Sequence, residues 1–157
     1  MIEVVNKTKF KFCQRKLKRL FLSFRDEFNL NDGEVSLVLV GDRKIRELNK
    51  QYRKIDKATD ILTFNASEDG LKYLKKNNYW GEIFINVLDI KRLKKYDEMF
   101  LEIEMKKSYS LKRQNYLFYF LIAHGLLHLA GFNDEYEKDR LKMLKIGKKL
   151  LDNANIN

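Results

Sequence analysis

Apolar and polar residues alternate along the chain in a way that predicts four short strands. Residues 2–5, 34–40 and 81–86 are rich in β-branched and other apolar side chains. Residues 59–64, which contain Ile61, Leu62 and Thr63, form a fourth run of this kind. We expect these strands to form one small mixed sheet.

Apolar residues at spacings of three and four predict helices between and after the strands. The first helix starts at Thr8, the second is capped by Asp42 and ends near Tyr52, and the third covers residues 87–107. A fourth helix starts near Leu111, and a final amphipathic helix follows it. The polar segment before the last strand contains turn residues and is expected to be an irregular hairpin excursion.

This order of elements predicts an α+β fold with a single domain over residues 1–157. Residues 116–123 are apolar on all sides, which predicts that their helix is buried at the centre of the domain. The Asn-rich end of the chain is expected to fray.

The composition adds a strong charge signal. The 157 residues carry a formal net charge of +10. Such a charge favours polyanionic partners, namely RNA, DNA or an acidic membrane surface. The chain also has no proline and many lysines, so compositional bias explains part of the charge, which alone is weak evidence for a nucleic-acid ligand.

Cys13 is the single cysteine, so an intrachain disulfide is impossible, which fits a reducing cytoplasm. It lies within a helical pattern, and we expect a small core residue there rather than a metal ligand. The first six residues lack a basic leader followed by an apolar run, so we expect neither secretion nor a membrane anchor. The predicted location is cytoplasmic.

The two histidines of the chain, His124 and His128, lie four residues apart. On a helix both rings leave the same face, one turn apart, and can share one metal ion. Gly131 can end the helix in a left-handed turn and return the chain toward the histidines, which makes Asp134 a candidate third ligand. Three protein ligands leave a fourth position for water, as in catalytic zinc sites.

A histidine on a buried helix is more often a hydrogen-bonded core residue than a ligand. Two histidines at helical spacing favour metal binding, because each buried imidazole without a partner costs roughly 1–3 kcal/mol and one ion satisfies both. A membrane span is a weaker alternative, because the apolar segment is shorter than the ~20 residues that a bilayer needs.

Residues 124–132, His-Gly-Leu-Leu-His-Leu-Ala-Gly-Phe, resemble a signature of the YbeY family, the metal-dependent endoribonucleases of rRNA maturation. That signature reads His-Gly-x-Leu-His-Leu-x-Gly-Tyr-Asp-His. Asn133 and Asp134 stand where the family has Asp-His, so an aspartate replaces the third histidine. An aspartate still binds hard or borderline metals, so we expect one divalent ion, Zn²⁺ before others, with its identity left open.

Residues 49–64 resemble a second family pattern, Asn-x-x-Tyr-Arg-x-x-Asp-x-Pro-Thr-Asp-Val-Leu-Ser-Phe, with Ala58 and Thr63 in place of the proline and serine. A third match is the Gly-Glu-Ile-x-Ile strand at residues 81–85. The resemblance implies that Arg53 lies near the metal cleft. A guanidinium suits that role because it holds a phosphate through two parallel hydrogen bonds. The alternative is that Arg53 is one more surface cation.

Two basic segments are candidates for RNA contact, although each is more simply a solvated surface. Basic and aromatic residues together can stack and clamp single-stranded RNA. The face of the first predicted helix carries Lys11, Arg15, Lys16, Lys18 and Arg19, and the segment before the last strand carries Lys72, Tyr73, Lys75, Lys76, Tyr79 and Trp80.

The predicted function is a single-strand-specific, metal-dependent endoribonuclease, with His124, His128 and Asp134 as metal ligands and Arg53 and His124 as catalytic residues. The resemblance implies action at the 3′ end of small-subunit rRNA, contact with small-subunit components, and ribosome quality control. One alternative is a non-catalytic RNA- or ribosome-binding assembly factor with a structural metal. Another, ranked lower, is a zinc peptidase, whose His-Glu-x-x-His motif has a glutamate base where this chain has Gly125.

Overall fold

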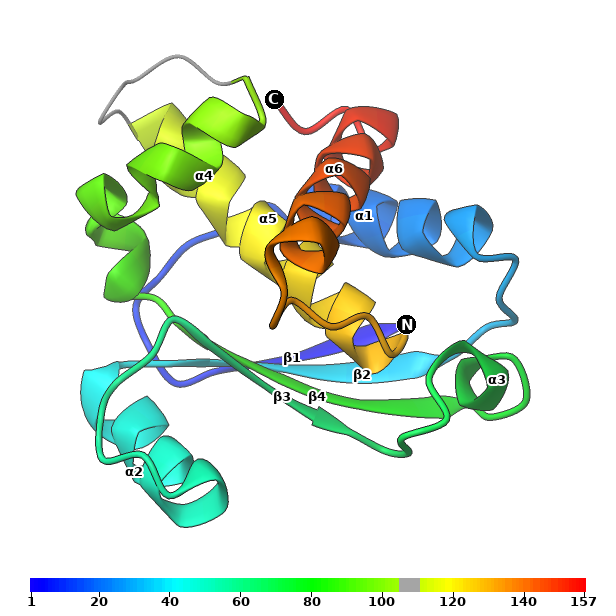
Figure 1. Ribbon diagram of the computed structural model, residues 1–157, viewed down its shortest axis with the longest axis horizontal. Coiled ribbons are helices and arrows are strands. Elements are labelled where there is room, and N and C mark those ends of the chain that lie inside the picture. Colours follow the sequence, from blue (N-terminus) through cyan, green and yellow to red (C-terminus); the bar gives the residue numbers. More distant parts are fainter. Residues whose placement is uncertain (105–110) are drawn as a thin grey trace.

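A computed structural model describes residues 1–104 and 111–157 of the chain. Its single sheet has the strand order β1-β2-β4-β3 (Figure 1). The strands β1 (Ile2–Asn6), β2 (Glu34–Val40) and β4 (Tyr79–Asn86) run parallel, and β3 (Ile61–Asn65) pairs antiparallel with β4 at one edge. The mixed sheet and the α+β fold class are therefore confirmed.

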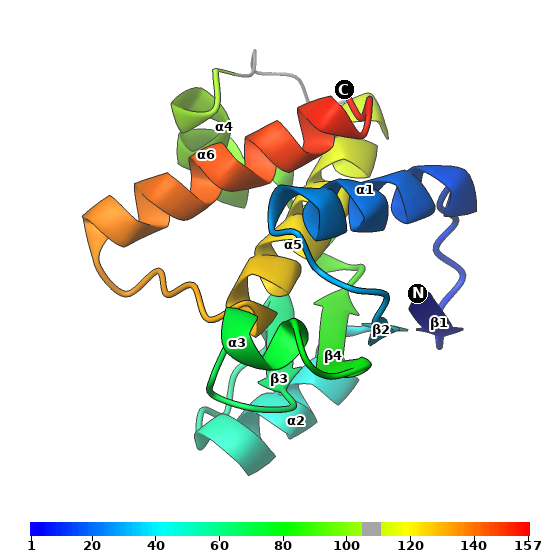
Figure 2. The ribbon, with the colours of Figure 1, turned by 90° about the vertical axis from the view of Figure 1, so that its right-hand side faces the viewer.

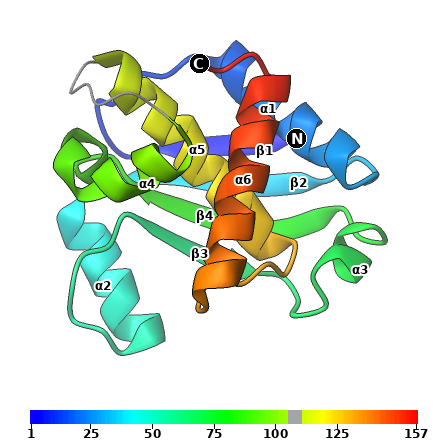
Figure 3. The ribbon, with the colours of Figure 1, turned by 45° about the horizontal axis from the view of Figure 1, so that its top comes forward.

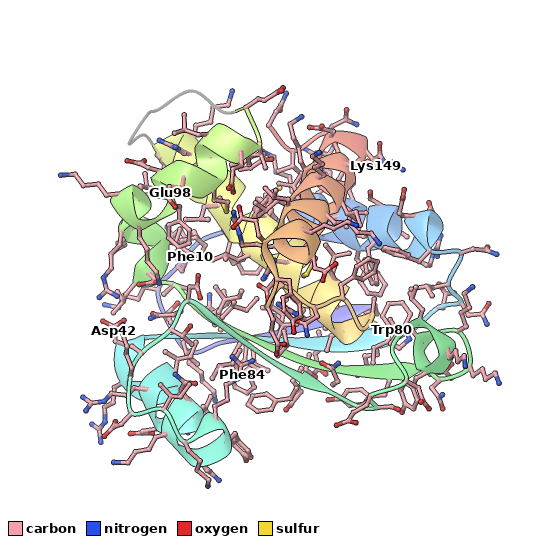
Figure 4. The ribbon with its side chains drawn as sticks, in the orientation of Figure 1. Phe10, Asp42, Trp80, Phe84, Glu98 and Lys149 are labelled. Carbon is pink, nitrogen blue, oxygen red and sulfur yellow. The ribbon has the colours of Figure 1, made fainter. Side chains whose placement is uncertain are left out.

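Helices cover both faces of this sheet. On one face lie α1 (Gln14–Glu27), α5 (Leu111–Leu129) and α6 (Glu137–Asn153), while α2 (Asp42–Arg53) packs alone on the other face (Figures 1 and 2). Phe84 on β4 points toward the α2 side (Figure 4). The helix α5 lies between the sheet and α6 (Figure 3), so the helix that carries both histidines is central, as predicted.

Close packing of α5 on the sheet depends on Gly125. A Cβ atom at this position would lie 3.0 Å from methyl groups of Ile61 and Ile83, which are on β3 and β4. From Tyr116 onward the apolar residues of α5 are at most 4% exposed, with Phe118 and Leu126 at 0%. The buried helix thus holds its C-terminal end at the β3 edge of the sheet.

The helix predicted over residues 87–107 is wrong. The chain instead forms two 3₁₀ turns, Asp89–Lys91 and Leu93–Tyr96, and the short helix α4 (Asp97–Glu102). The cause is the burial of Asp89 in the folded domain: its carboxylate accepts hydrogen bonds from Arg92, Lys95 and Tyr96, which wraps the chain tightly around it. Residues 105–107 of that prediction lie outside the described part of the chain.

Other boundaries differ locally from the prediction. The first helix starts at Gln14 rather than Thr8, because the Asn6 side chain bonds the Thr8 amide and the Phe10 carbonyl in a local turn. The segment between β3 and β4 contains a short helix, α3 (Leu71–Leu74). Asp42 is the first residue of α2, and Gly41 before it is the N-cap.

Two further predictions on burial are wrong. Cys13 is exposed at the N-terminus of α1, where its amide donates to the Tyr119 hydroxyl. The end of the chain does not fray, because Ala154 and Ile156 are buried against the core at 2% and 1% exposure. Within the described ranges, no helix has the length and apolarity that crossing a membrane requires.

Candidate metal centre

His124 and His128 leave α5 one helical turn apart, with their Nε2 atoms 3.0 Å from each other. Their rings are perpendicular, at 89°, and both are half-buried. They lie at the C-terminal end of α5, beside β3: the Asn65 side-chain amide at the end of that strand donates to the His128 carbonyl at 3.1 Å.

The chain after α5 turns sharply at Gly131. Gly131 has a φ of +87°, its amide donates to the His128 carbonyl, and the Phe132 amide donates to the Leu127 carbonyl at 3.0 Å. This pair of bonds is the Schellman ending of a helix, which favours glycine at the left-handed position. A Cβ at Gly131 would also lie 3.2 Å from Cα of Gly70, so two backbones touch here.

The turn returns Asp134 to the histidines. Its Oδ2 atom lies 3.2 Å from Nε2 of His124 and 3.7 Å from Nε2 of His128. The neighbouring Asn133 is occupied otherwise, because its side-chain oxygen accepts the Glu135 amide at 2.8 Å. The structure therefore brings together the three residues that the sequence suggested as ligands.

The hydrogen bonds of His128 set its tautomer. Its Nδ1 lies 3.0 Å from the Phe132 carbonyl oxygen, which can only accept, so Nδ1 carries the proton and Nε2 presents a lone pair. Burial, reinforced by the nearby His124, lowers the pKa of His128. A hydrogen bond from His124 holds the pKa of Asp134 below its usual value. A neutral imidazole and an ionised carboxylate are the states that bind metal.

The spacing of the three ligand atoms suits a tetrahedral ion. Bonds of about 2.0–2.2 Å in tetrahedral geometry separate ligand atoms by about 3.4 Å. The three observed separations, 3.0, 3.2 and 3.7 Å, bracket that value. Two imidazole nitrogens with one carboxylate oxygen also form a donor set that zinc accepts. The residues present therefore fit one divalent ion.

These three residues lie in a cleft of about 750 Å³. Arg53, the last residue of α2, reaches the same cleft from the other side of β3. Its guanidinium makes no hydrogen bond or ion pair with any residue in 1–104 or 111–157 and is exposed to solvent. The cleft thus combines a metal-capable group with a free cation.

Asp60 and Tyr96 are among the residues of the cleft that sequence reasoning missed. The Tyr96 hydroxyl lies 3.1 Å from Asp60 and 3.0 Å from Asp89, and burial with these carboxylates raises the pKa of Tyr96, so the phenol stays protonated. Asp60 could have been found, since it lies inside the Thr-Asp-Ile-Leu-Thr-Phe run. Tyr96 gave no local signal.

The suggested base-stacking role of Trp80 is wrong. Trp80 is 1% exposed, packs against Phe21 and Phe24 of α1, and donates its indole N–H to the Asn77 carbonyl. Figure 4 places it at the α3 end of the sheet. An RNA base cannot reach this ring.

The chain is similar to known proteins along nearly its whole length. The family model for Endoribonuclease YbeY matches residues 2–155. An endoribonuclease YbeY of Heliobacterium modesticaldum is 34% identical, with 91% of this chain and 84% of that protein covered. One of Mycoplasma mobile is 29% identical, with 99% and 95% covered. The solution structure of a Thermotoga maritima protein superposes with a TM-score of 0.53 at 26% identity, covering 98% of this chain and 89% of the other. The chain therefore belongs to the endoribonuclease YbeY family.

Proposed function

We propose that this protein is a metal-dependent endoribonuclease in which His124, His128 and Asp134 hold one divalent ion, Zn²⁺, and Arg53 holds a phosphate of the RNA. The observation that carries the proposal is the spacing of the three ligand atoms, all within 4.8 Å, in a cleft that a free guanidinium shares. Family membership supports an RNA substrate and a role in rRNA maturation.

The three protein ligands leave a fourth position open, which is the arrangement of a catalytic site. When bound, the ion would lower the pKa of water to about 7 and polarise a phosphate oxygen. The Phe132 carbonyl holds the His128 ring by its Nδ1–H, a contact that fixes ring orientation. His124, whose Nε2 lies 3.2 Å from Oδ2 of Asp134, would present its lone pair on the same face.

Arg53 would act on the substrate directly. A guanidinium can donate two parallel hydrogen bonds to a phosphate and offset the charge that develops during cleavage. Since no described residue neutralises Arg53, its donors are available to the RNA. The net charge of +10 would draw the substrate toward the protein.

The biological target in this proposal is single-stranded RNA at the 3′ end of small-subunit rRNA. Components of the small ribosomal subunit would be partners, the cytoplasm the location, and ribosome quality control a further role. These assignments follow from the family resemblance.

The packing of Gly125 argues against a zinc peptidase. In the peptidase motif this position carries the glutamate that serves as general base. Here a side chain at residue 125 would run into Ile61 and Ile83 on the sheet, at 3.0 Å from its first atom. No base can point from this position toward the substrate.

Single-turnover cleavage of a single-stranded RNA tests the role of Arg53. Arg53→Lys should lose almost as much rate as Arg53→Ala, by roughly the 2–4 kcal/mol of one transition-state donor, because lysine lacks the bidentate fork. Metal content should stay unchanged. The control is Lys18→Ala on α1, an exposed cation that does not line the cleft, which should weaken RNA binding at most and leave the saturated rate unchanged.

A wild-type rate for Arg53→Lys at saturating RNA would make Arg53 one more attracting cation. A separate variant tests whether the metal ligands are needed for cleavage: His124 and His128 are both replaced by alanine. Intact RNA processing by that folded variant would favour an assembly factor with a structural metal over an enzyme.

A further inference from the structure

The outer edge of β3 carries backbone groups that point away from the sheet. The Asn86 amide donates to the Asp60 carbonyl at 2.8 Å, and the Ala66 amide donates to the Trp80 carbonyl at 3.2 Å. In an antiparallel pair, hydrogen-bonded residues alternate with residues whose groups face outward. In the register of β3 with β4, the backbone N–H and C=O groups of three residues therefore point away from β4: Ile61, Thr63 and Asn65.

These outward groups are almost all without a partner. The Ile61 amide is bonded by the Asp60 carboxylate at 2.9 Å. The backbone N–H and C=O groups of Thr63 and Asn65 make no outward hydrogen bond with any residue in 1–104 or 111–157. The strand also lacks the proline or charged residue with which proteins usually protect an open edge.

This open edge forms a wall of the metal cleft. Thr63 and Asn65 line the same cavity as Arg53 and His124. The Asn65 side chain reaches the backbone of the other histidine, His128, at 3.1 Å. A strand of RNA with its phosphate at the metal centre would therefore place a neighbouring nucleotide against β3.

We propose that the free edge of β3, chiefly the N–H and C=O of Thr63, hydrogen-bonds the Watson–Crick edge of an unpaired base next to the scissile phosphate. Every RNA base has a donor beside an acceptor on that edge, so one backbone residue can bind each of them. The edge would thus select unpaired RNA without selecting its sequence, since a duplex has this edge occupied. The inference rests on the proposed function.

The observations favour RNA over an extended polypeptide at this edge. A polypeptide strand could also add to β3. The edge is continuous with a cleft that holds the free Arg53 guanidinium and the metal-capable group, both of which suit a phosphodiester. Binding of a peptide instead of RNA at this edge would overturn the inference.

The substrate arm of the test uses two methylated bases. A short single-stranded RNA would carry 3-methyluridine or 5-methyluridine beside the cleaved bond. The first methyl group blocks the Watson–Crick donor, whereas the second lies on the opposite edge of the base. We expect kcat/KM to fall about tenfold or more for 3-methyluridine, as the loss of one or two hydrogen bonds produces, and to stay within twofold for 5-methyluridine.

The protein arm uses Thr63→Pro. Proline removes one N–H, and at an outward-facing edge position it leaves the ladder to β4 intact. Thr63→Ala, which keeps both backbone groups, should lose less activity. Val4→Pro is the matched control, because Val4 faces outward on β1 at the opposite edge of the sheet. Thermal unfolding and zinc content would establish that each variant folds.

The effect of the methylated base and the effect of Thr63→Pro should not add, if both remove the same contact. In Thr63→Pro the 3-methyluridine penalty should largely disappear, because the base has already lost its site. Equal cleavage of both methylated RNAs by the wild type, or wild-type cleavage by folded Thr63→Pro, overturns the inference. So does unchanged cleavage of naked RNA with lost binding to small-subunit particles, which would assign the edge to a polypeptide. Wild-type protein that binds zinc but cleaves no RNA would instead refute the proposed function.

Discussion

Gly131 controls the turn that carries Asp134, so Gly131→Ala is a sharp test of how the metal centre is built. Its φ of +87° is one that side chains with a Cβ rarely adopt. The new Cβ would also lie 3.2 Å from Cα of Gly70, a backbone atom that cannot swing aside. Gly70 is itself constrained, because it has a φ of +52° and a Cβ there would lie 2.7 Å from the Ala130 carbonyl oxygen.

The magnitude follows from these two contacts. The left-handed backbone costs roughly 1–2 kcal/mol, and crowding adds about 1–2 kcal/mol, for a total of about 2–4 kcal/mol. If the turn keeps its shape, the free energy of unfolding falls by this amount. If the turn moves instead, the Phe132 carbonyl leaves His128 and Asp134 leaves the site, so zinc affinity falls, by about 30- to 700-fold.

Two measurements capture either outcome: urea unfolding in the presence of a chelator, and zinc affinity by chelator competition. Gly131→Asn should be compared with Gly131→Ala, because asparagine tolerates the left-handed region but still has the Cβ that crowds Gly70. Gly131→Asn should therefore lose less stability or zinc affinity than Gly131→Ala. Wild-type stability together with wild-type zinc affinity in Gly131→Ala would refute the argument that this turn holds the site.

Two further predictions concern the same region. In elemental analysis, Asp134→Ala should retain less zinc than the wild type, whereas Asn133→Ala should retain nearly as much. Asp134→His should restore zinc binding. Equal zinc retention in all variants would exclude Asp134 as a ligand. Gly125→Glu, which creates a peptidase-like motif, should destabilise the fold by about 3 kcal/mol or more in urea unfolding and yield no peptidase activity, because the side chain is forced against Ile61 and Ile83. A stable variant that cleaves peptides would contradict the packing seen at α5.

Most elements could be predicted from local pattern, because strand and helix periodicities are properties of a few neighbouring residues. The four strands and the buried α5 lie close to where the alternation and the apolar run indicated. The prediction of a helix over 87–107 was wrong because apolar spacing takes no account of the buried Asp89 carboxylate, to which Arg92 and Lys95 both donate. The prediction for Cys13 failed for a different reason: a local turn at Asn6 and Thr8 delays the start of α1, so that Cys13 is its N-cap and not part of its buried face.

The sequence by itself determined the pairing of His124 with His128, because helical geometry alone puts residues four apart on one face. It also indicated the turn at Gly131, since only glycine adopts that backbone freely. The resemblance implied that Arg53 lies near the cleft, but only the tertiary structure decided that its guanidinium lines the cleft without a partner among the described residues, and that β3 has an open edge beside it. Both depend on the strand order β1-β2-β4-β3 and on how closely α5 packs over Gly125, which are outcomes of packing across the whole chain.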